Sequence, residues 1–164
     1  MKIAISGPGG CGKDTAAELI SRNWGLVYNH STSYQAKDFV FRHMFIQLGI
    51  KFDSAEECYH QRRYHREIWA ACIDDYNRID AAKLYREHLE SGQQILTGIR
   101  KLREFLACKS EKLFDLSIWI ERPNFTSTDT TQEYGPEQCD FILYNDTPEL
   151  LEQRIKNLAC QLKL

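Results

Sequence analysis

Residues 7–15 of the chain are Gly7-Pro8-Gly9-Gly10-Cys11-Gly12-Lys13-Asp14-Thr15, between a short apolar run at residues 3–5 and a helix-like segment. Glycines let the backbone turn its N–H groups inward, and the amino end of a following helix adds partial positive charge. Such a concave set of donors suits phosphate oxygens, and a lysine at this spacing reaches the terminal phosphates. The order of strand, glycine-rich loop and helix therefore predicts a phosphate-binding loop (P-loop) for a nucleoside triphosphate.

The P-loop departs from its usual pattern at one position. Asp14 stands where a serine or threonine is usual, and Thr15 follows one place later. A carboxylate and a hydroxyl both offer the oxygen ligands that Mg²⁺ prefers, so the sequence leaves Asp14 and Thr15 as alternative metal ligands. The predicted ATP-binding residues of the loop are Gly9, Gly10, Cys11, Gly12, Lys13, Asp14 and Thr15.

Two other interpretations of the glycines are weaker. A simple turn before a helix does not account for the lysine and the spacing. The spacing of Gly7, Gly9 and Gly12 also fits the dinucleotide-binding pattern, which expects an acidic residue about twenty positions later. The candidate second strand at residues 26–28 is followed by Asn29 and His30, so that carboxylate is missing.

Size and composition favour one globular domain over residues 1–164. Hydrophobic residues make up 43% and charged residues 27% of the chain, and the net charge of −2 argues against a nucleic-acid or membrane-surface binder. None of the six cysteines forms a C-x-x-C pair, which disfavours zinc and redox motifs. The chain shows no signal peptide or membrane-spanning run, so we expect a cytoplasmic protein with reduced thiols.

Hydrophobic periodicity predicts alternating strands and helices. We expect strands near 2–6, 26–28, 94–97, 113–120 and 141–144, and helices near 13–22, 34–48, 55–76, 81–91, 101–109 and from 148 onward. This alternation predicts an α/β fold with a parallel five-stranded sheet flanked by helices. Ligands of such sheets bind at the carboxyl ends of the strands. The P-loop, Arg100, Arg122 and Asn145 all follow strands closely and should share that edge.

A second cationic site is predicted in the middle of the chain. Trp69, Cys72, Ile73 and Tyr76 have the spacing of a buried helical stripe. Stepping back along the same stripe gives Arg66 and Arg62. Arginines that face inward need an anion, because an unpaired buried charge is costly. A carboxylate of the protein or a substrate phosphate would both serve.

Lys37 presents a similar case at the start of the preceding helix. It lies one turn before Phe41 on a stripe that continues through Met44, Phe45 and Leu48. A surface lysine that extends its chain over apolar neighbours is the alternative interpretation. A phosphate cradle and a separate cationic pocket on one small domain indicate phosphoryl transfer between nucleotides, which needs positioning and charge neutralisation.

The chain resembles the P-loop nucleoside monophosphate kinases, and it is closest to the phage-type deoxynucleoside monophosphate kinase family. The likeness spans most of the chain, and the P-loop is its most specific element. The segments that carry it are Gly12-Lys13-Asp14-Thr15, Ala36-Lys37-Asp38, Thr97-Gly98-Ile99-Arg100, Glu121-Arg122-Pro123 and Cys139-Asp140-Phe141-Ile142-Leu143-Tyr144-Asn145.

The resemblance implies a role for each site residue, with ATP and Mg²⁺ as cofactors. Lys13 and Arg122 would be catalytic, Arg122 acting from a short lid at about residues 122–136. A salt bridge to Glu121 or Glu104 is the alternative role of Arg122. A helical region at about 34–79 would bind the acceptor monophosphate through Lys37, Arg62, Arg66 and Arg100. Asn145 and Thr147 would lie near the adenine of ATP, with a helix cap as the alternative role of Thr147.

One departure from the family's pattern concerns the metal. The family has an acidic residue after the threonine of the third segment, and this chain has Gly98. The expected partners are small nucleotides, with a homodimer as an open alternative, and the host cytoplasm is the expected location if the chain is viral. The sequence does not specify the acceptor base or a preference for deoxyribose.

Three other functions fit the same residues. The first is a P-loop kinase of another small metabolite, of the dephospho-coenzyme A or phosphomevalonate type. The second is a nucleotide-binding module without catalysis, which the missing carboxylate at Gly98 would explain. The third is a nucleotide-regulated assembly protein.

Overall fold

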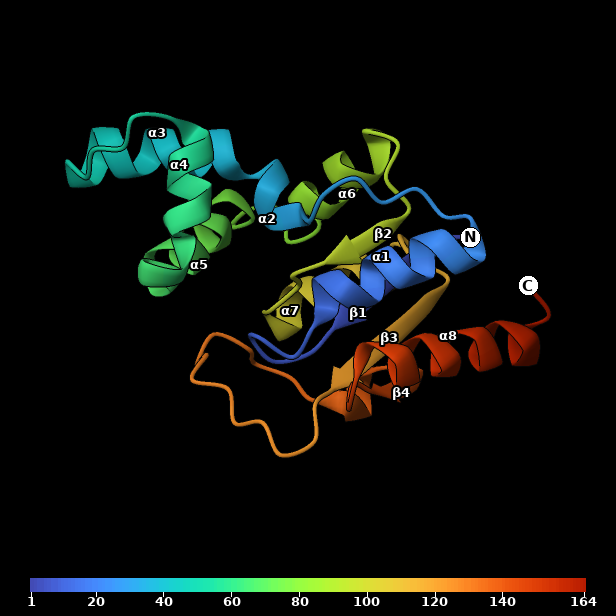
Figure 1. Cartoon of the computed structure of the whole chain (residues 1–164). Helices are drawn as coiled ribbons and strands as arrows, with labels where there is room; N and C mark the ends of the chain where they lie inside the picture. Colours follow the sequence, from blue (N-terminus) through green and yellow to red (C-terminus); the bar gives the residue numbers. More distant parts are fainter.

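A parallel β-sheet forms the centre of the fold (Figure 1). The structure is a computed structural model that describes residues 1–164, except for the side chain of Phe45. Every pairing in the sheet is parallel, and the strand order is β2-β1-β3-β4. The strands are β1 Ile3–Ser6, β2 Ile95–Thr97, β3 Leu116–Glu121 and β4 Phe141–Tyr144.

Helices cover both faces of this sheet. Helices α1 and α8 share one core cluster with it, and α6 and α7 share another. Two 3₁₀ turns, η1 Gln61–Tyr64 and η2 Pro136–Gln138, complete the regular structure. The helices are α1 Lys13–Trp24, α2 Thr32–Gln35, α3 Lys37–Leu48, α4 Ala55–His60, α5 Arg66–Tyr76, α6 Lys83–Glu90, α7 Leu102–Ser110 and α8 Pro148–Leu162. The structure confirms the predicted α/β class.

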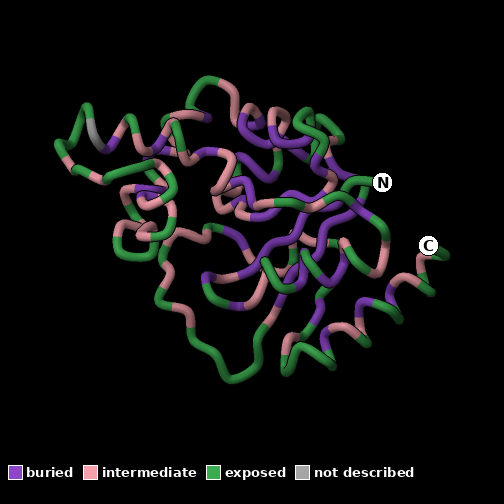
Figure 2. The backbone as a smooth tube through the Cα atoms, turned by 45° about the horizontal axis from the view of Figure 1, so that its top comes forward, coloured by how far each residue is buried: buried purple, intermediate pink, exposed green. Residues whose placement is uncertain are grey.

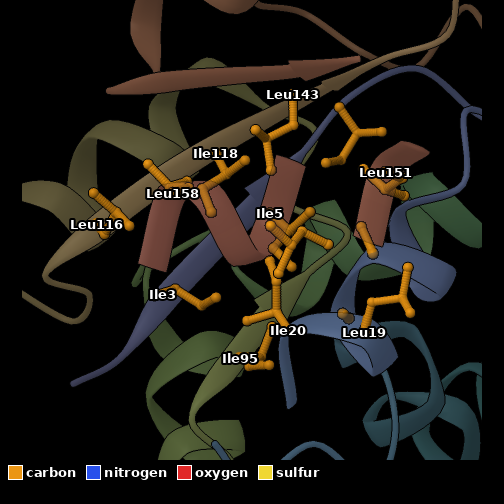
Figure 3. Packing of buried hydrophobic residues seen from close by; sticks show 14 of the residues in the cluster. Ile3, Ile5, Leu19, Ile20, Ile95, Leu116, Ile118, Leu143, Leu151 and Leu158 are labelled. Carbon is orange, nitrogen blue, oxygen red and sulfur yellow. The ribbon is translucent and has the colours of Figure 1, made fainter. Parts of the chain in front are cut away.

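Side-chain alternation along the strands places the two clusters. Ile3 and Ile5 pack with Ile118 and Leu158 under α1 and α8 (Figure 3). Trp119 belongs to the opposite cluster. Successive side chains of a strand point to opposite faces of the sheet. A central strand that is apolar at every position can therefore be buried on both faces. Figure 2 shows β1, β2 and most of β3 buried, whereas the edge strand β4 and much of the long loop after β3 are largely exposed.

The helical region forms a third cluster of its own. Val40 and Met44 of α3 pack with Cys58 of α4 and with Trp69 and Cys72 of α5. The predicted inward stripe of α5 is therefore confirmed at its two most buried members. The prediction for the side chain of Phe45 lies outside the described part of the chain.

The sheet has four strands, so the prediction of five was wrong. Residues 26–28 are not a strand, although they lie beside the start of β2. The N–H of Gln94 donates to the carbonyl of Val27 at 2.8 Å, as in a ladder. The N–H of Val27, however, donates to the side-chain Oε1 of Gln94 at 2.9 Å. The Gln94 side chain thus occupies the N–H of Val27 in place of a backbone carbonyl. The backbone pairing of residues 26–28 with the start of β2 therefore ends after one hydrogen bond.

The helix predicted at 55–76 is interrupted. Helix α4 ends at His60, a 3₁₀ turn follows, and His65 leaves helical geometry at φ −127° and ψ 32°. The guanidinium of Arg62 donates to the carbonyl of Tyr59 at 3.0 Å, a carbonyl that a continuing helix would use. Arg62 and Arg66 therefore lie on different elements, and the prediction of a single stripe through both was wrong.

Three other boundaries moved by a few residues. The helix predicted at 34–48 is divided at Ala36 into α2 and α3, and Ser31 caps the first part by accepting from the N–H of Tyr34 at 3.2 Å. The helix after Asp80 begins at Lys83, because the Asp80 side chain accepts from the N–H of Ala82 in a turn. Strand β3 begins at Leu116.

Within the described residues, none of the helices is both long and apolar enough to cross a bilayer.

Replacing Leu151 by alanine should destabilise the fold strongly. Leu151 is 0% exposed under the sheet, whereas its neighbour Leu150 is 43% exposed. We expect the free energy of unfolding to fall by about 2–5 kcal/mol for Leu151→Ala and by less than about 1 kcal/mol for Leu150→Ala. Urea denaturation of the two variants measures the difference, and equal losses would contradict the placement of α8.

A buried histidine should make the fold sensitive to mild acid. His88 is fully buried, with Nε2 at 3.3 Å from the carbonyl of Ile95. Burial and the nearby His30 lower the pKa of His88 to about 4. The unfolded chain, with a histidine pKa of 6.5, takes up a proton that the native state excludes, so stability is full above pH 6.5 and falls toward pH 4.

Between pH 7 and pH 5 the native protein should lose about 2 kcal/mol through His88. The variant His88→Gln keeps a donor for the Ile95 carbonyl and has no titrating ring. Its free energy of unfolding should therefore change less over this range, as urea denaturation at both pH values would show. Identical pH dependence in the two proteins would contradict the assignment.

Candidate functional site

The P-loop has the backbone that phosphate binding needs. Gly10 and Gly12 take the positive φ angles 83° and 96°, which side chains rarely adopt. A Cβ on Gly10 would lie 2.9 Å from the ring of Phe125, and one on Gly12 would collide with Asn145. Helix α1 begins at Lys13, directly after this turn. The first N–H groups of a helix have no partner within it, so they are available to an anion at the loop.

Lys13 lies across the loop that it follows. Its Nζ donates to the carbonyls of Gly7 and Pro8, both at 2.7 Å. Burial lowers the pKa of Lys13, and the charge of Arg100 acts in the same direction. The ammonium is thus held beside the glycine turn.

A cavity of about 290 Å³ opens from the P-loop between the sheet edge and α5. One wall comes from the P-loop and the start of α1, and the opposite wall comes from η1 and α5. The floor comes from the loop after β2 and from α7. The lining residues are Gly9, Gly10, Gly12, Lys13, Asp14, Thr15, Ser31, Ser33, Arg62, Arg66, Trp69, Ala70, Ile73, Thr97, Gly98, Arg100, Lys101 and Glu104.

Three predicted arginines meet at this cavity. Arg62 from η1, Arg66 from α5 and Arg100 after β2 all line it, although they come from three elements. The guanidinium of Arg62 also stacks on the ring of Tyr59, at 3.8 Å from its centroid. Arg62 and Arg66 lie at one cavity, as predicted, but the predicted cause was wrong. The turn between η1 and α5 brings them together, not a continuous helical stripe.

Asp129 holds two of these arginines, and the sequence gave no sign of it. Its Oδ2 accepts from Nη1 of Arg66 at 2.8 Å and also from Nη1 of Arg100. Burial opposes ionisation of Asp129, but the hydrogen bonds from Thr131 and the charges of Arg100 and Arg66 outweigh it. The pKa of Asp129 is therefore held well below its ordinary value.

The lid, residues 122–136, contacts the P-loop through alternate residues. The ring of Phe125 lies against Gly10, Ser127 Oγ donates to the carbonyl of Gly9 at 2.8 Å, and Asp129 lies beside Gly9. Residues 125–129 are without helix or turn, so alternate side chains point the same way. Figure 1 shows this long loop between β3 and β4 extending past the same end of the sheet as the P-loop.

Four predicted site residues lie outside the cavity lining, and one of them, Cys11, is a fully buried residue of the P-loop. Nζ of Lys37 lies 3.8 Å from the centroid of the Tyr34 ring and 3.9 Å from an oxygen of Glu56. Arg122 is exposed, with its guanidinium 5.2 Å from the Phe125 ring centroid. The side chain of Asn145 donates to the carbonyl of Cys11 at 2.8 Å and so supports the P-loop from outside. The structure does not test the predicted roles of these residues toward substrate.

The alternative roles of two residues are settled by their contacts. Thr147 caps α8 by accepting from the N–H of Leu150 at 3.3 Å. Among the described ion pairs, Arg122 forms none with Glu121 or Glu104. Glu121 accepts from the Trp119 indole at 2.8 Å instead.

Glu104 is a buried carboxylate at the floor of the cavity. It accepts from the hydroxyl of Tyr85 at 2.6 Å and from the amide of Asn77 at 2.9 Å. Burial raises its pKa, although both hydrogen bonds oppose that effect. These hydrogen bonds join α7, and with it the loop that carries Arg100, to α6 through Tyr85 and to the end of α5 through Asn77.

The candidate metal ligands are open to the cavity. Asp14 and Thr15 are exposed in the first turn of α1, and the hydroxyl of Tyr28 donates to Oδ1 of Asp14 at 3.3 Å. Gly98, where the family's carboxylate is missing, has φ 92°, and a Cβ there would lie 3.1 Å from Thr32 Oγ1. The described residues contain no cluster of three or more His, Cys, Asp or Glu side chains placed to hold a metal ion. Mg²⁺ with one or two protein oxygens, phosphate oxygens and water fits this donor set.

Comparison with known proteins identifies the fold. The chain matches no family model, and no curated protein is significantly similar to it in sequence. Among solved structures it is similar to the crystal structure of shikimate kinase from Bacteroides thetaiotaomicron, with a TM-score of 0.50 and 9% identity. The alignment covers 100% of this chain and 99% of that one. The chain therefore shares the α/β fold of that structure, with a parallel sheet flanked by helices.

Alanine at Gly12 should weaken nucleotide binding by more than backbone strain alone would explain. Gly12 and Gly25 both have positive φ, at 96° and 69°, but a Cβ on Gly25 meets nothing within 4 Å. Both variants should lose about 1 kcal/mol of stability. Only Gly12→Ala should weaken ATP binding, by at least about tenfold, because the loop must shift to clear Asn145. Calorimetric titration with ATP tests this, and equal binding by both variants would contradict the site.

Proposed function

We propose that the protein transfers the γ-phosphoryl group of ATP to a small acceptor that carries a phosphate, preferentially a nucleoside or deoxynucleoside monophosphate. The observation that carries this proposal is one cavity shared by the P-loop and by Arg62, Arg66 and Arg100. A P-loop alone serves hydrolysis and transfer equally well. A second group of guanidiniums facing it supplies a place for a second phosphorylated molecule. The phage-type resemblance of the sequence supports the same acceptor class.

The residues at the P-loop fit ATP and Mg²⁺. The backbone N–H groups of the loop and of the first turn of α1 would hold the β- and γ-phosphates. Lys13 would neutralise the transferring group, and Asp14 or Thr15 would bind the metal. When bound, ATP supplies the phosphoryl group and Mg²⁺ neutralises charge on its phosphates. The chain itself contributes orientation and positive charge, which is most of what phosphoryl transfer requires.

The acceptor side also offers an apolar surface. Trp69, Ala70 and Ile73 of α5 line the cavity beyond the arginines, and Glu104 lies at its floor. A flat, partly apolar body such as a nucleobase suits this wall, and its N–H groups could donate to the carboxylate. The phosphate of the same molecule would then lie at Arg62, Arg66 and Arg100.

A kinase of another small metabolite is the second candidate. The fold likeness to shikimate kinase favours it. Shikimate, the metabolite in that protein's name, carries a carboxylate, whereas a nucleoside monophosphate carries a phosphate. Guanidiniums bind carboxylates and phosphates through the same forked geometry, so the arginine wall fits both. The acceptor assay should therefore include shikimate, dephospho-coenzyme A and phosphomevalonate beside the nucleoside and deoxynucleoside monophosphates.

The test is formation of ADP and phosphorylated product from ATP and Mg²⁺ with each acceptor. We expect turnover with at least one monophosphate. ATP binding without product from any acceptor would favour the non-catalytic module, and turnover confined to shikimate or another metabolite would select the second candidate.

Substitutions should separate the two sides of the cavity. Lys13→Ala should lower kcat by at least about 100-fold, because it removes charge at the transferring phosphoryl group. Arg62→Ala and Arg66→Ala should raise the acceptor KM by roughly tenfold while the KM for ATP changes little. Arg63→Ala is the matched control, since Arg63 is exposed and bonds the hydroxyl of Tyr64 at 2.7 Å. A control effect as large as that of Arg62 would contradict the assignment.

A further inference from the structure

One carboxylate joins three parts of the molecule that meet at the cavity. The side chain of Asp129 is 3% exposed, and its Oδ2 accepts from Arg66 and from Arg100. Asp129 belongs to the lid, Arg66 begins α5 in the helical region, and Arg100 follows β2 at the sheet edge. A single oxygen thus links the lid to α5 and to the loop after β2.

Asp129 lies beside Gly9 of the P-loop and is not one of the residues that line the cavity. Arg66 and Arg100 are among the lining residues that the structure describes, and Asp129 is not. Their side chains are 38% and 21% exposed. Each donates to Asp129 through Nη1, and the described hydrogen bonds of these two guanidiniums use Nη1 alone. A guanidinium has five N–H groups, so the others are left for a ligand on the cavity side.

Asp129 is itself held in place by its neighbours. Its Oδ1 accepts from the N–H of Thr131 at 3.0 Å and from the hydroxyl of Thr131 at 2.6 Å. Its N–H donates to Ser127 Oγ at 3.1 Å, and that hydroxyl donates to the carbonyl of Gly9 at 2.8 Å. The carboxylate is therefore fixed relative to the P-loop, and it can fix the arginines in turn.

We infer that Asp129 is a positioning residue that aims Arg66 and Arg100 at the phosphate of the acceptor. This inference rests on the proposed function and adds the lid to its acceptor site. The ligand class is a phosphate monoester or a related dianion, whose several oxygens can each take an N–H from a different guanidinium. An arginine that is already oriented loses less side-chain entropy when the ligand binds.

The sign of one mutational effect separates this role from simple electrostatics. Removing a negative charge near an anion site normally tightens anion binding, because a repulsion is lost. A positioning residue predicts the opposite, since the arginines lose their orientation. Glu137 provides the matched control, because it is an exposed acid close to the lid whose carboxylate accepts from the N–H of Gly135 at 3.2 Å.

The probe is inorganic phosphate, titrated calorimetrically into the full chain and its variants. Asp129→Asn should bind it roughly tenfold more weakly than the unaltered protein, and Glu137→Gln should bind within about twofold. In a background that carries Arg66→Gln and Arg100→Gln, Asp129→Asn should change the affinity by less than about twofold. Unchanged or tighter binding by Asp129→Asn would overturn the inference. So would a tenfold loss of affinity on adding Asp129→Asn to the protein that lacks Arg66 and Arg100.

A measurement on the unaltered protein keeps the inference testable if Asp129→Asn fails to fold. In ¹⁵N-labelled protein, the Nε–Hε signals of Arg66 and Arg100 should show restricted motion, and Arg66→Lys and Arg100→Lys spectra assign them. Signals averaged to those of a free arginine would overturn the inference. Neither experiment requires turnover, so an acceptor panel without product would count against the proposed function alone.

Discussion

The unpaired N–H groups at the amino end of α1 are the constraint on which the rest of the structure depends. They follow a glycine turn that side chains cannot adopt, and they open at the carboxyl edge of a parallel sheet. An edge that concentrates positive potential needs compensation by an anion, either a ligand or a carboxylate of the chain. Within the chain, Asp129 of the lid supplies such a carboxylate, whereas Arg62, Arg66 and Arg100 add further positive charge to the same cavity.

Much of the fold could be predicted because its determinants are local. The alternation of β3, the glycine turn before Lys13, the Ser31 and Ser54 caps and the Thr147-Pro148 start of α8 all depend on neighbours in sequence. The errors arose where a distant or competing group intervened. Residues 26–28 have strand-like composition, but the Gln94 side chain ends their ladder. Arg62 sits where a helix would continue, but its own guanidinium takes a carbonyl of the last turn.

The candidate site was predictable in its types of residue and not in its contacts. The P-loop, Arg66 and Arg100 follow from motif, stripe and strand ends, since each of these fixes a backbone position. Asp129 has no such signal, because it lies in a polar loop without periodicity and acquires its role only when the lid folds over Gly9. Lys37 and Arg122 were predicted as site residues, and each lies over an aromatic ring outside the cavity lining, a contact that the sequence did not indicate.

The helical region has a core separate from the two clusters of the sheet. A body that keeps its own packing can rotate with little loss of buried apolar area, whereas a helix that shares the sheet's core cannot. The break between α2 and α3 at Ala36 supplies a hinge on one side of that body. The bond between Arg66 and the lid adds a tether on the cavity side of that body, opposite the bonds from Asn77 to Glu104 and from Arg103 to Asp74 that fasten its other end to α7.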